Sequence, residues 1–212
     1  MLKRLSPRAL AYIALAACLT LVGTGPLQAA SLKHQNLTQL IASSESIIAG
    51  TVKSVSDGVD AKGVPYTEIT IAVGSSAKGK AKSGEEFTFR QFGLLKPRTL
   101  DNGHKLLAVT PEGFARWNQG EYVVAFMYRP AAKTGLQTTA GMAQGKFSAV
   151  NGRLANQFGN QGLFDSVNID RGLLNQEERD MLESRGAVDL GVFTRLVGRA
   201  VEQQWVEQGV MK

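Results

Sequence analysis

An uninterrupted apolar stretch in the middle of the chain constrains the fold more than any other feature. Glu121 is followed by seven apolar or aromatic residues, and the stretch ends at Arg129 and Pro130. It is too short to span a membrane, and its β-branched and aromatic residues favour a strand over a helix. Alternate residues of a strand face opposite sides of a sheet, and here both sets are apolar. We therefore expect a central strand within residues 120–129 that is covered on both faces.

The first 29 residues have the pattern of a signal peptide. A basic start is followed by an uncharged apolar run from Ala9 to Val22, and small residues at Ala29 and Ala30 offer a cleavage site. Cleavage after Ala29 predicts an exported protein, either periplasmic or secreted. An uncleaved membrane anchor is the less favoured alternative because the apolar run is short.

A cysteine in this leader leaves a second alternative open. The sequence Leu15–Cys18 resembles a bacterial lipobox, in which the cysteine is acylated, so we expect a lipoprotein attached to the membrane only if Cys18 is lipidated. Ordinary cleavage is favoured because Leu19 continues the apolar run. The mature chain then has no cysteine, and therefore no disulfide, thiolate metal site or cysteine nucleophile.

The positive charge of the chain does not indicate a nucleic-acid partner. Three of the 24 basic residues and none of the 18 acidic residues lie in the leader, so processing lowers the net charge from +6 to +3. The one dense basic cluster is Lys78, Lys80 and Lys82, in a Gly/Ser-rich connection without an aromatic neighbour. Nucleic-acid interfaces carry a denser basic patch than this.

Short apolar segments separated by turn residues predict a mostly antiparallel sheet. We expect these strands, in chain order: 46–56, 66–73, 85–92, 105–110, 120–129, 135–140 and 145–150. The dipeptide Asn151-Gly152 is a strong hairpin signal that should pair residues 146–150 with 153–157. Because no helix separates consecutive strands, the sheet should close into a small barrel or sandwich. Gly50 marks a bulge or a close backbone approach.

Helices are expected at the two ends of the mature chain. Asn36 should cap a short helix to Ser44, and Asn175 a helix to Arg185. A third helix begins near Asp189, and its apolar residues from 193 to 205 recur at helical spacing. We expect it to cover the sheet, with partner binding as the alternative. The fold class is thus mainly β (α+β), with a signal peptide (1–29), a β-barrel domain (31–170) and a C-terminal helical extension packed on the barrel (171–212).

No pattern of a catalytic centre, metal site or cofactor site occurs. His34 and His104 are the two histidines, and neither belongs to an H-E-x-x-H motif. His104 is close to Asp101 in sequence, but a third metal ligand is missing at a suitable spacing. Residues Ser75 to Lys78 match S-x-x-K, but they lie in a turn rather than at the start of a helix, so we interpret the match as chance.

Four residues are candidate contacts for a ligand or partner. Phe114 and Trp117 lie in the loop before the central strand, where we expect packing by default and an exposed contact surface as the alternative. Lys146 follows a glycine-flanked turn that begins at Gly141 and suggests a backbone requirement. It should emerge on the face opposite Phe147. His104, in its polar loop, completes the set.

Several short segments between residues 37 and 150 share their order with a known family. They are Ile48–Val52, Tyr66–Thr70, Lys78-Gly79, Gly120–Tyr128 and Gly141–Phe147. Together these segments resemble an uncharacterised family of small exported bacterial proteins. The resemblance implies an OB-type β-barrel similar to the module of tissue inhibitors of metalloproteinases and netrins, with no established activity.

These patterns favour a non-enzymatic exported domain that binds a protein or cell-envelope component. One alternative is a peptidase inhibitor or accessory factor for a secreted metallopeptidase, which depends on the resemblance alone. The other is a hydrolase whose site is built from several loops, which requires a concave pocket with a titratable pair.

Overall fold

A computed structural model describes residues 34–212 of the chain. The predicted signal peptide and Cys18 lie outside these residues. Within residues 34–212, no helix is long and apolar enough to cross a membrane.

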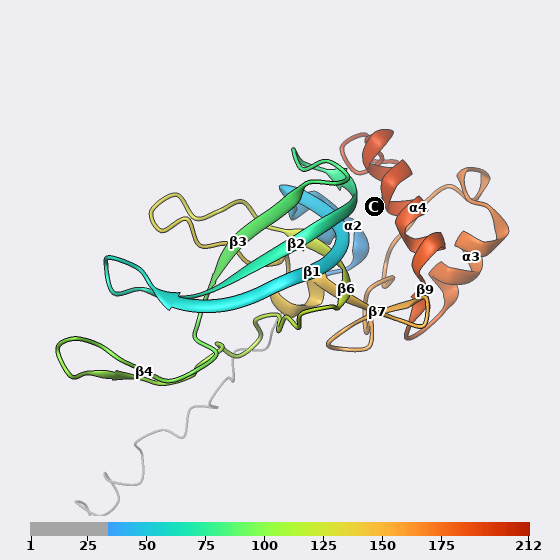
Figure 1. The fold of residues 1–212 in the computed structure, drawn as a ribbon. Helices are drawn as coiled ribbons and strands as arrows, with labels where there is room; N and C mark the ends of the chain where they lie inside the picture. Colours follow the sequence, from blue (N-terminus) through green and yellow to red (C-terminus); the bar gives the residue numbers. More distant parts are fainter. Residues whose placement is uncertain (1–33) are drawn as a thin grey trace, which may run out of the picture. The chain divides into compact units, whose positions relative to one another are not determined.

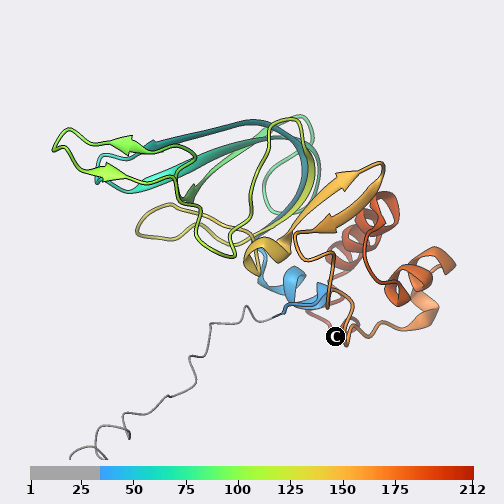
Figure 2. The same cartoon turned by 90° about the horizontal axis from the view of Figure 1, so that it is seen from below.

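A seven-stranded antiparallel sheet organises the described residues, in the order β3-β2-β1-β6-β7-β8-β9 (Figure 1). Its strands are β1 (Ser46–Val59), β2 (Pro65–Lys78), β3 (Glu86–Phe92), β6 (Tyr122–Met127), β7 (Lys146–Val150), β8 (Arg153–Asn156) and β9 (Val188–Asp189). A separate hairpin consists of β4 (Arg98–Thr99) and β5 (Lys105–Leu106). In Figure 2 this hairpin runs beside the β1–β2 hairpin, and the Arg98 side chain pairs with Asp57 of β1.

The central strand predicted from the apolar stretch is β6, which lies between β1 and β7. Val124 and Phe126 belong to one core, on the face that carries the helices. Val123, Ala125 and Met127 belong to a second core on the opposite face. The predicted burial of both faces is confirmed.

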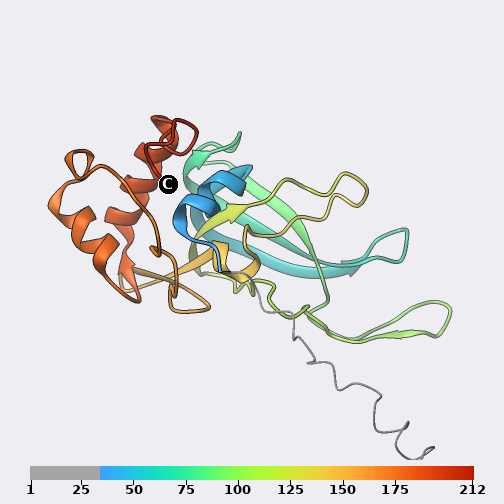
Figure 3. The ribbon, with the colours of Figure 1, turned by 180° about the vertical axis from the view of Figure 1, so that it is seen from behind.

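The first core joins the sheet to three helices. These are α2 (Leu37–Ser43), α3 (Gln176–Glu183) and α4 (Leu190–Glu202), with two short 3₁₀ turns, η1 (Met142–Gly145) and η2 (Arg171–Leu173). α2 lies next to α4 and the sheet (Figure 3). Phe193 of α4 packs against Phe126 and Phe147, with ring centroids 6.3 Å and 5.2 Å away. Through these aromatic contacts α4 packs on the sheet, as expected.

Local signals placed the helix starts and the hairpin correctly. Asn36, Asn175 and Asp189 each accept a hydrogen bond from the first turn of the helix that follows, which satisfies a backbone amide that the helix leaves free. Asn151 and Gly152 both have positive φ, 51° and 76°, as a type I′ turn requires.

The sheet is open, so the prediction of a closed barrel or a sandwich is wrong. The edge strands β3 and β9 do not pair with each other. β9 has two residues, and after it the chain turns into α4, which contacts both β9 and β2.

The segment predicted as a strand over residues 135–140 contains only an isolated bridge, between Met127 and Thr139. Its residues divide their hydrogen bonds between two strands: Ala140 donates to Phe126 of β6, whereas Gln137 donates to Arg90 of β3. One backbone hydrogen bond to β3 does not make a β-ladder. The segment therefore does not extend the sheet beyond β3.

Candidate functional site

A short strap of chain, Ala115–Asn118, crosses the second core just before β6. Along it burial alternates: Ala115 and Trp117 are buried, and Arg116 and Asn118 are exposed. The Trp117 ring meets Phe89 edge-on, with centroids 5.2 Å apart. The predicted packing of this loop onto the sheet is confirmed for Trp117, which is 7% exposed.

The buried amide of Gln91 ties the strap to β3. Its oxygen accepts a hydrogen bond from Trp117 Nε1 at 3.3 Å, and its Nε2 donates to the Ala115 carbonyl at 3.0 Å. Both polar ends of the side chain are thus satisfied, as a residue that is 2% exposed requires. The strap is anchored by polar bonds as well as by the tryptophan.

Beside the strap, three polar side chains form a closed ring. Lys146 Nζ donates to Glu121 Oε1 at 2.6 Å and to Ser148 Oγ at 2.9 Å, and Ser148 Oγ donates to the same Glu121 oxygen at 2.5 Å. Lys146 and Ser148 are two residues apart on β7 and therefore face the same side of the sheet. The lysine ammonium also lies 5.5 Å from the centre of the Trp117 ring, within range of a cation–π contact.

Burial and hydrogen bonding shift the pKa values of this ring in definite directions. Burial alone would raise the pKa of Glu121, but the hydrogen bonds from Lys146 and Ser148 outweigh it and hold the pKa below its ordinary value. Burial lowers the pKa of Lys146, and the bond to Glu121 offsets only part of that effect. Across the 2.6 Å contact, the charge of each partner compensates that of the other.

Two hollows flank the strap. The Trp117 hollow has a volume of about 460 Å³ and lies over the sheet, with a lining that includes Val55, Thr67, Gln91, Leu94, Leu95 and Val109. The Lys146 hollow has a volume of about 350 Å³, with a lining that includes Glu121, Lys146, Ser148, Val150, Ala155 and Gln157. Ala115, Arg116 and Asn118 line both hollows, so the strap is their shared wall.

Three exposed apolar side chains line these hollows. Among the described residues, six large hydrophobic side chains are exposed: Phe92, Leu95, Leu107, Val109, Val150 and Leu173. Leu95 and Val109 line the Trp117 hollow, and Val150 lines the Lys146 hollow. Single exposed apolar residues are ordinary on a protein surface, whereas a group of them is typical of a contact site.

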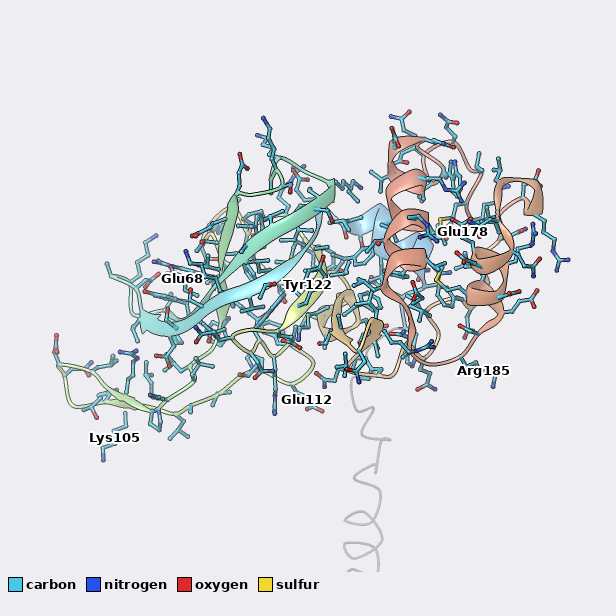
Figure 4. The ribbon with its side chains drawn as sticks, turned by 45° about the vertical axis from the view of Figure 1, so that its right-hand side comes forward. Glu68, Lys105, Glu112, Tyr122, Glu178 and Arg185 are labelled. Atoms are coloured by element: carbon cyan, nitrogen blue, oxygen red, sulfur yellow. The ribbon has the colours of Figure 1, made fainter. Side chains whose placement is uncertain are left out.

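The structure brings together two of the four residues predicted as contacts, Trp117 and Lys146. Phe114 is partly buried on the segment leading to the strap, and its backbone amide donates to the Pro111 carbonyl. His104 is exposed at the tip of the β4–β5 hairpin, away from the ring. Figure 4 labels its neighbour Lys105, which lies far from Tyr122 at the start of β6.

Sequence reasoning missed Glu121, Ser148 and Arg116. One available signal was the alternation of Lys146 and Ser148 on a strand, which places both on one face. The S-x-x-K match is not part of this ring. It lies at the end of β2, where Lys78 Nζ donates to the Ile41 carbonyl of α2. Lys146 does emerge on the face opposite Phe147, as predicted.

The other buried carboxylate, Glu178, has a structural role. It lies in the first turn of α3, accepts a hydrogen bond from the Asn175 backbone amide and pairs with Arg199 of α4 at 2.5 Å (Figure 4). These bonds fasten the two helices together. Among residues 34–212, no three His, Cys, Asp or Glu side chains come together as a metal site.

Comparisons of the chain with protein-family models, with curated proteins and with solved structures find no match.

Proposed function

We propose that this protein is an exported, non-enzymatic binding domain that docks an apolar segment of a protein or cell-envelope component at the Trp117 hollow. The observation that carries the proposal is that Leu95 and Val109, which are 46% and 49% exposed, both line this hollow. The predicted signal peptide and the resemblance to an exported OB-type family support the location.

The gain from covering these side chains is large enough to support specific binding. Burying one large aliphatic side chain stabilises a complex by about 1.5–3 kcal/mol relative to leaving it in water. Leu95 and Val109 line the hollow itself. A partner that covers both therefore gains several times the thermal energy before any polar contact is counted.

The test uses the mature protein on a support, with an envelope extract of the producing cells under crosslinking. Wild type is compared with the double variant Leu95→Asp/Val109→Asp, which places two charges at the hollow. We expect wild type to retain a specific set of components and the double variant to lose them.

Leu173→Asp is the matched control, because Leu173 is exposed on η2 and lines neither hollow. It should retain the same components as wild type. Equal recovery by the double variant, or no specific component with wild type, would show that the Trp117 hollow is not a binding surface.

We also propose a second candidate function, ester hydrolysis, because the Lys146 hollow contains the titratable pair that a hydrolase needs. A serine, a base within hydrogen-bond reach and a third orienting group are the parts of a nucleophilic centre. Ser148 Oγ would attack the ester carbonyl while Glu121 takes its proton, and the Lys146 ammonium would stabilise the negative charge. The alcohol would leave with that proton, and water would repeat the sequence to release the acid and free Ser148.

A fluorophosphonate probe tests this candidate without a known substrate. Wild type should become covalently labelled at Ser148, whereas Ser148→Ala should not. Absence of labelling in the folded wild-type protein would leave the ring with a structural role alone.

A further inference from the structure

The strap is a wall shared by the two hollows, so one ligand can reach both by crossing it. Ala115 and Trp117 point into the core, and Arg116 and Asn118 point outward into the space above both hollows. Apolar side chains are available on each side: Leu95 and Val109 at the Trp117 hollow, and Val150 at the Lys146 hollow.

The backbone of the strap is open to a further chain. Within residues 34–212, the amide and carbonyl groups of Arg116 and Trp117 have no hydrogen-bond partner. Backbone groups in proteins are nearly always paired with protein or with water. A peptide that crosses the strap can form hydrogen bonds with such groups at the crossing point.

The charge at the crossing point is positive and uncompensated. Among the described residues, Arg116 forms no ion pair, and its side chain is exposed. The nearby cations are occupied, since Lys146 pairs with Glu121 and Arg98 pairs with Asp57. Arg116 is therefore the group available to a carboxylate, which a guanidinium binds through two parallel hydrogen bonds.

We propose that the two hollows and the strap form one site for an extended peptide with the pattern apolar-x-acidic-x-apolar. In an extended chain, alternate side chains point to the same side. The first apolar side chain enters the Trp117 hollow, the acidic side chain meets Arg116, and the second apolar side chain covers Val150. This inference rests on the proposed binding function and specifies the ligand that the same surface recognises.

Three synthetic nonapeptides serve as probes, each labelled with fluorescein and titrated with the mature protein by fluorescence anisotropy. The first contains Leu-Ser-Glu-Ser-Leu, the second contains the same residues in the order Leu-Glu-Ser-Ser-Leu, and the third replaces the glutamate of the first by lysine. We expect the first to bind at least about tenfold more tightly than either of the others, because the wrong register or a like charge loses the contact with Arg116.

Charge exchange provides the decisive comparison. Arg116→Glu should weaken binding of the glutamate probe and should strengthen binding of the lysine probe above the wild-type level. Lys133→Glu is the matched control, because Lys133 is exposed, lines neither hollow and undergoes the same change of charge. It should leave both affinities unchanged.

Failure of this inference differs from failure of the proposed function. If Arg116→Glu leaves all three affinities unchanged, or if no probe binds wild type at millimolar protein, the acidic pattern is wrong. The proposed function is then still decided by the loss of envelope components in Leu95→Asp/Val109→Asp. If that double variant retains the components while the charge exchange succeeds, the contact between Arg116 and an acidic side chain stands, and the docking of envelope components at the Trp117 hollow is wrong.

Discussion

Lys146 and Glu121 form an ion pair at 2.6 Å in which both side chains are largely shielded from water, with 9% and 17% of their surfaces exposed. The pair links β7 to the turn that leads into β6, directly beside Trp117. Removing one member of a shielded pair leaves the other charge buried without a counterion. The resulting loss of stability is larger than the stability that the intact pair contributes.

Replacing Glu121 with glutamine should therefore destabilise the protein. We expect Glu121→Gln to lower the free energy of unfolding by about 3 kcal/mol, because the Lys146 ammonium loses its counterion but stays buried. Urea unfolding followed by far-UV circular dichroism measures the change. The control is Glu45→Gln, since Glu45 pairs with Arg129 at an exposed site and its loss should cost about 0.5 kcal/mol or less. Equal effects of the two substitutions would contradict the structural role of the ring.

The same pair predicts a pH dependence with a definite sign. The pKa of Glu121 in the folded protein is below its ordinary value of 4.5, so the folded state holds the ionised carboxylate more firmly than the unfolded state does. That contribution is fully present above 4.5 and is lost as the pH falls through the folded-state pKa. The stability difference between wild type and Glu121→Gln should thus be constant near neutral pH and shrink in acid. A difference that grows in acid would rule out an ionised Glu121.

The elements that the sequence predicted well are those with local causes. The apolar stretch after Glu121 specifies a strand buried on both faces, and Asn36, Asn175 and Asp189 cap helices because of the residues next to them. These signals act over a few positions, so one sequence contains all the necessary information.

The ring and the open sheet have long-range causes. Ser148 lies opposite Val123, and Lys146 lies opposite Ala125, so the register between β6 and β7 brings both polar side chains next to Glu121. Nothing near Lys146 in the sequence specifies that register. The lack of pairing between the edge strands β3 and β9 likewise depends on residues far apart in the sequence, which no local pattern reveals. Long-range pairing is the information that the sequence alone did not provide.

Gly50 is required for the close pairing of β1 and β2. A Cβ at this position would lie 2.2 Å from the Ala72 carbonyl oxygen, at a register shift in the β1–β2 ladder. We expect Gly50→Ala to cost about 1–3 kcal/mol, because the backbone of β2 must move. Gly74→Ala is the control on the same strand pair, since its nearest atoms lie at 3.5 Å or more. Thermal unfolding should show a clear loss of stability for the first variant and little change for the second.

Phe193 provides the test of whether the two faces of the sheet unfold together. It packs on Phe126, and the neighbours of Phe126 in β6 face the second core. Truncation to alanine should cost about 3–5 kcal/mol by creating a cavity in the first core.

The reporter for that test is on the other face. In a Trp205→Phe background, Trp117 is the one remaining tryptophan of the chain, and its fluorescence reports on the strap. We expect Phe193→Ala to shift the urea transitions of Trp117 fluorescence and of circular dichroism by the same amount, because a cooperative unit loses both cores at once. Leu173→Ala in the same background, at an exposed apolar site, should shift neither. If the two signals separate in Phe193→Ala, then β6 does not couple its faces, and binding at the strap would be independent of the packing of α4.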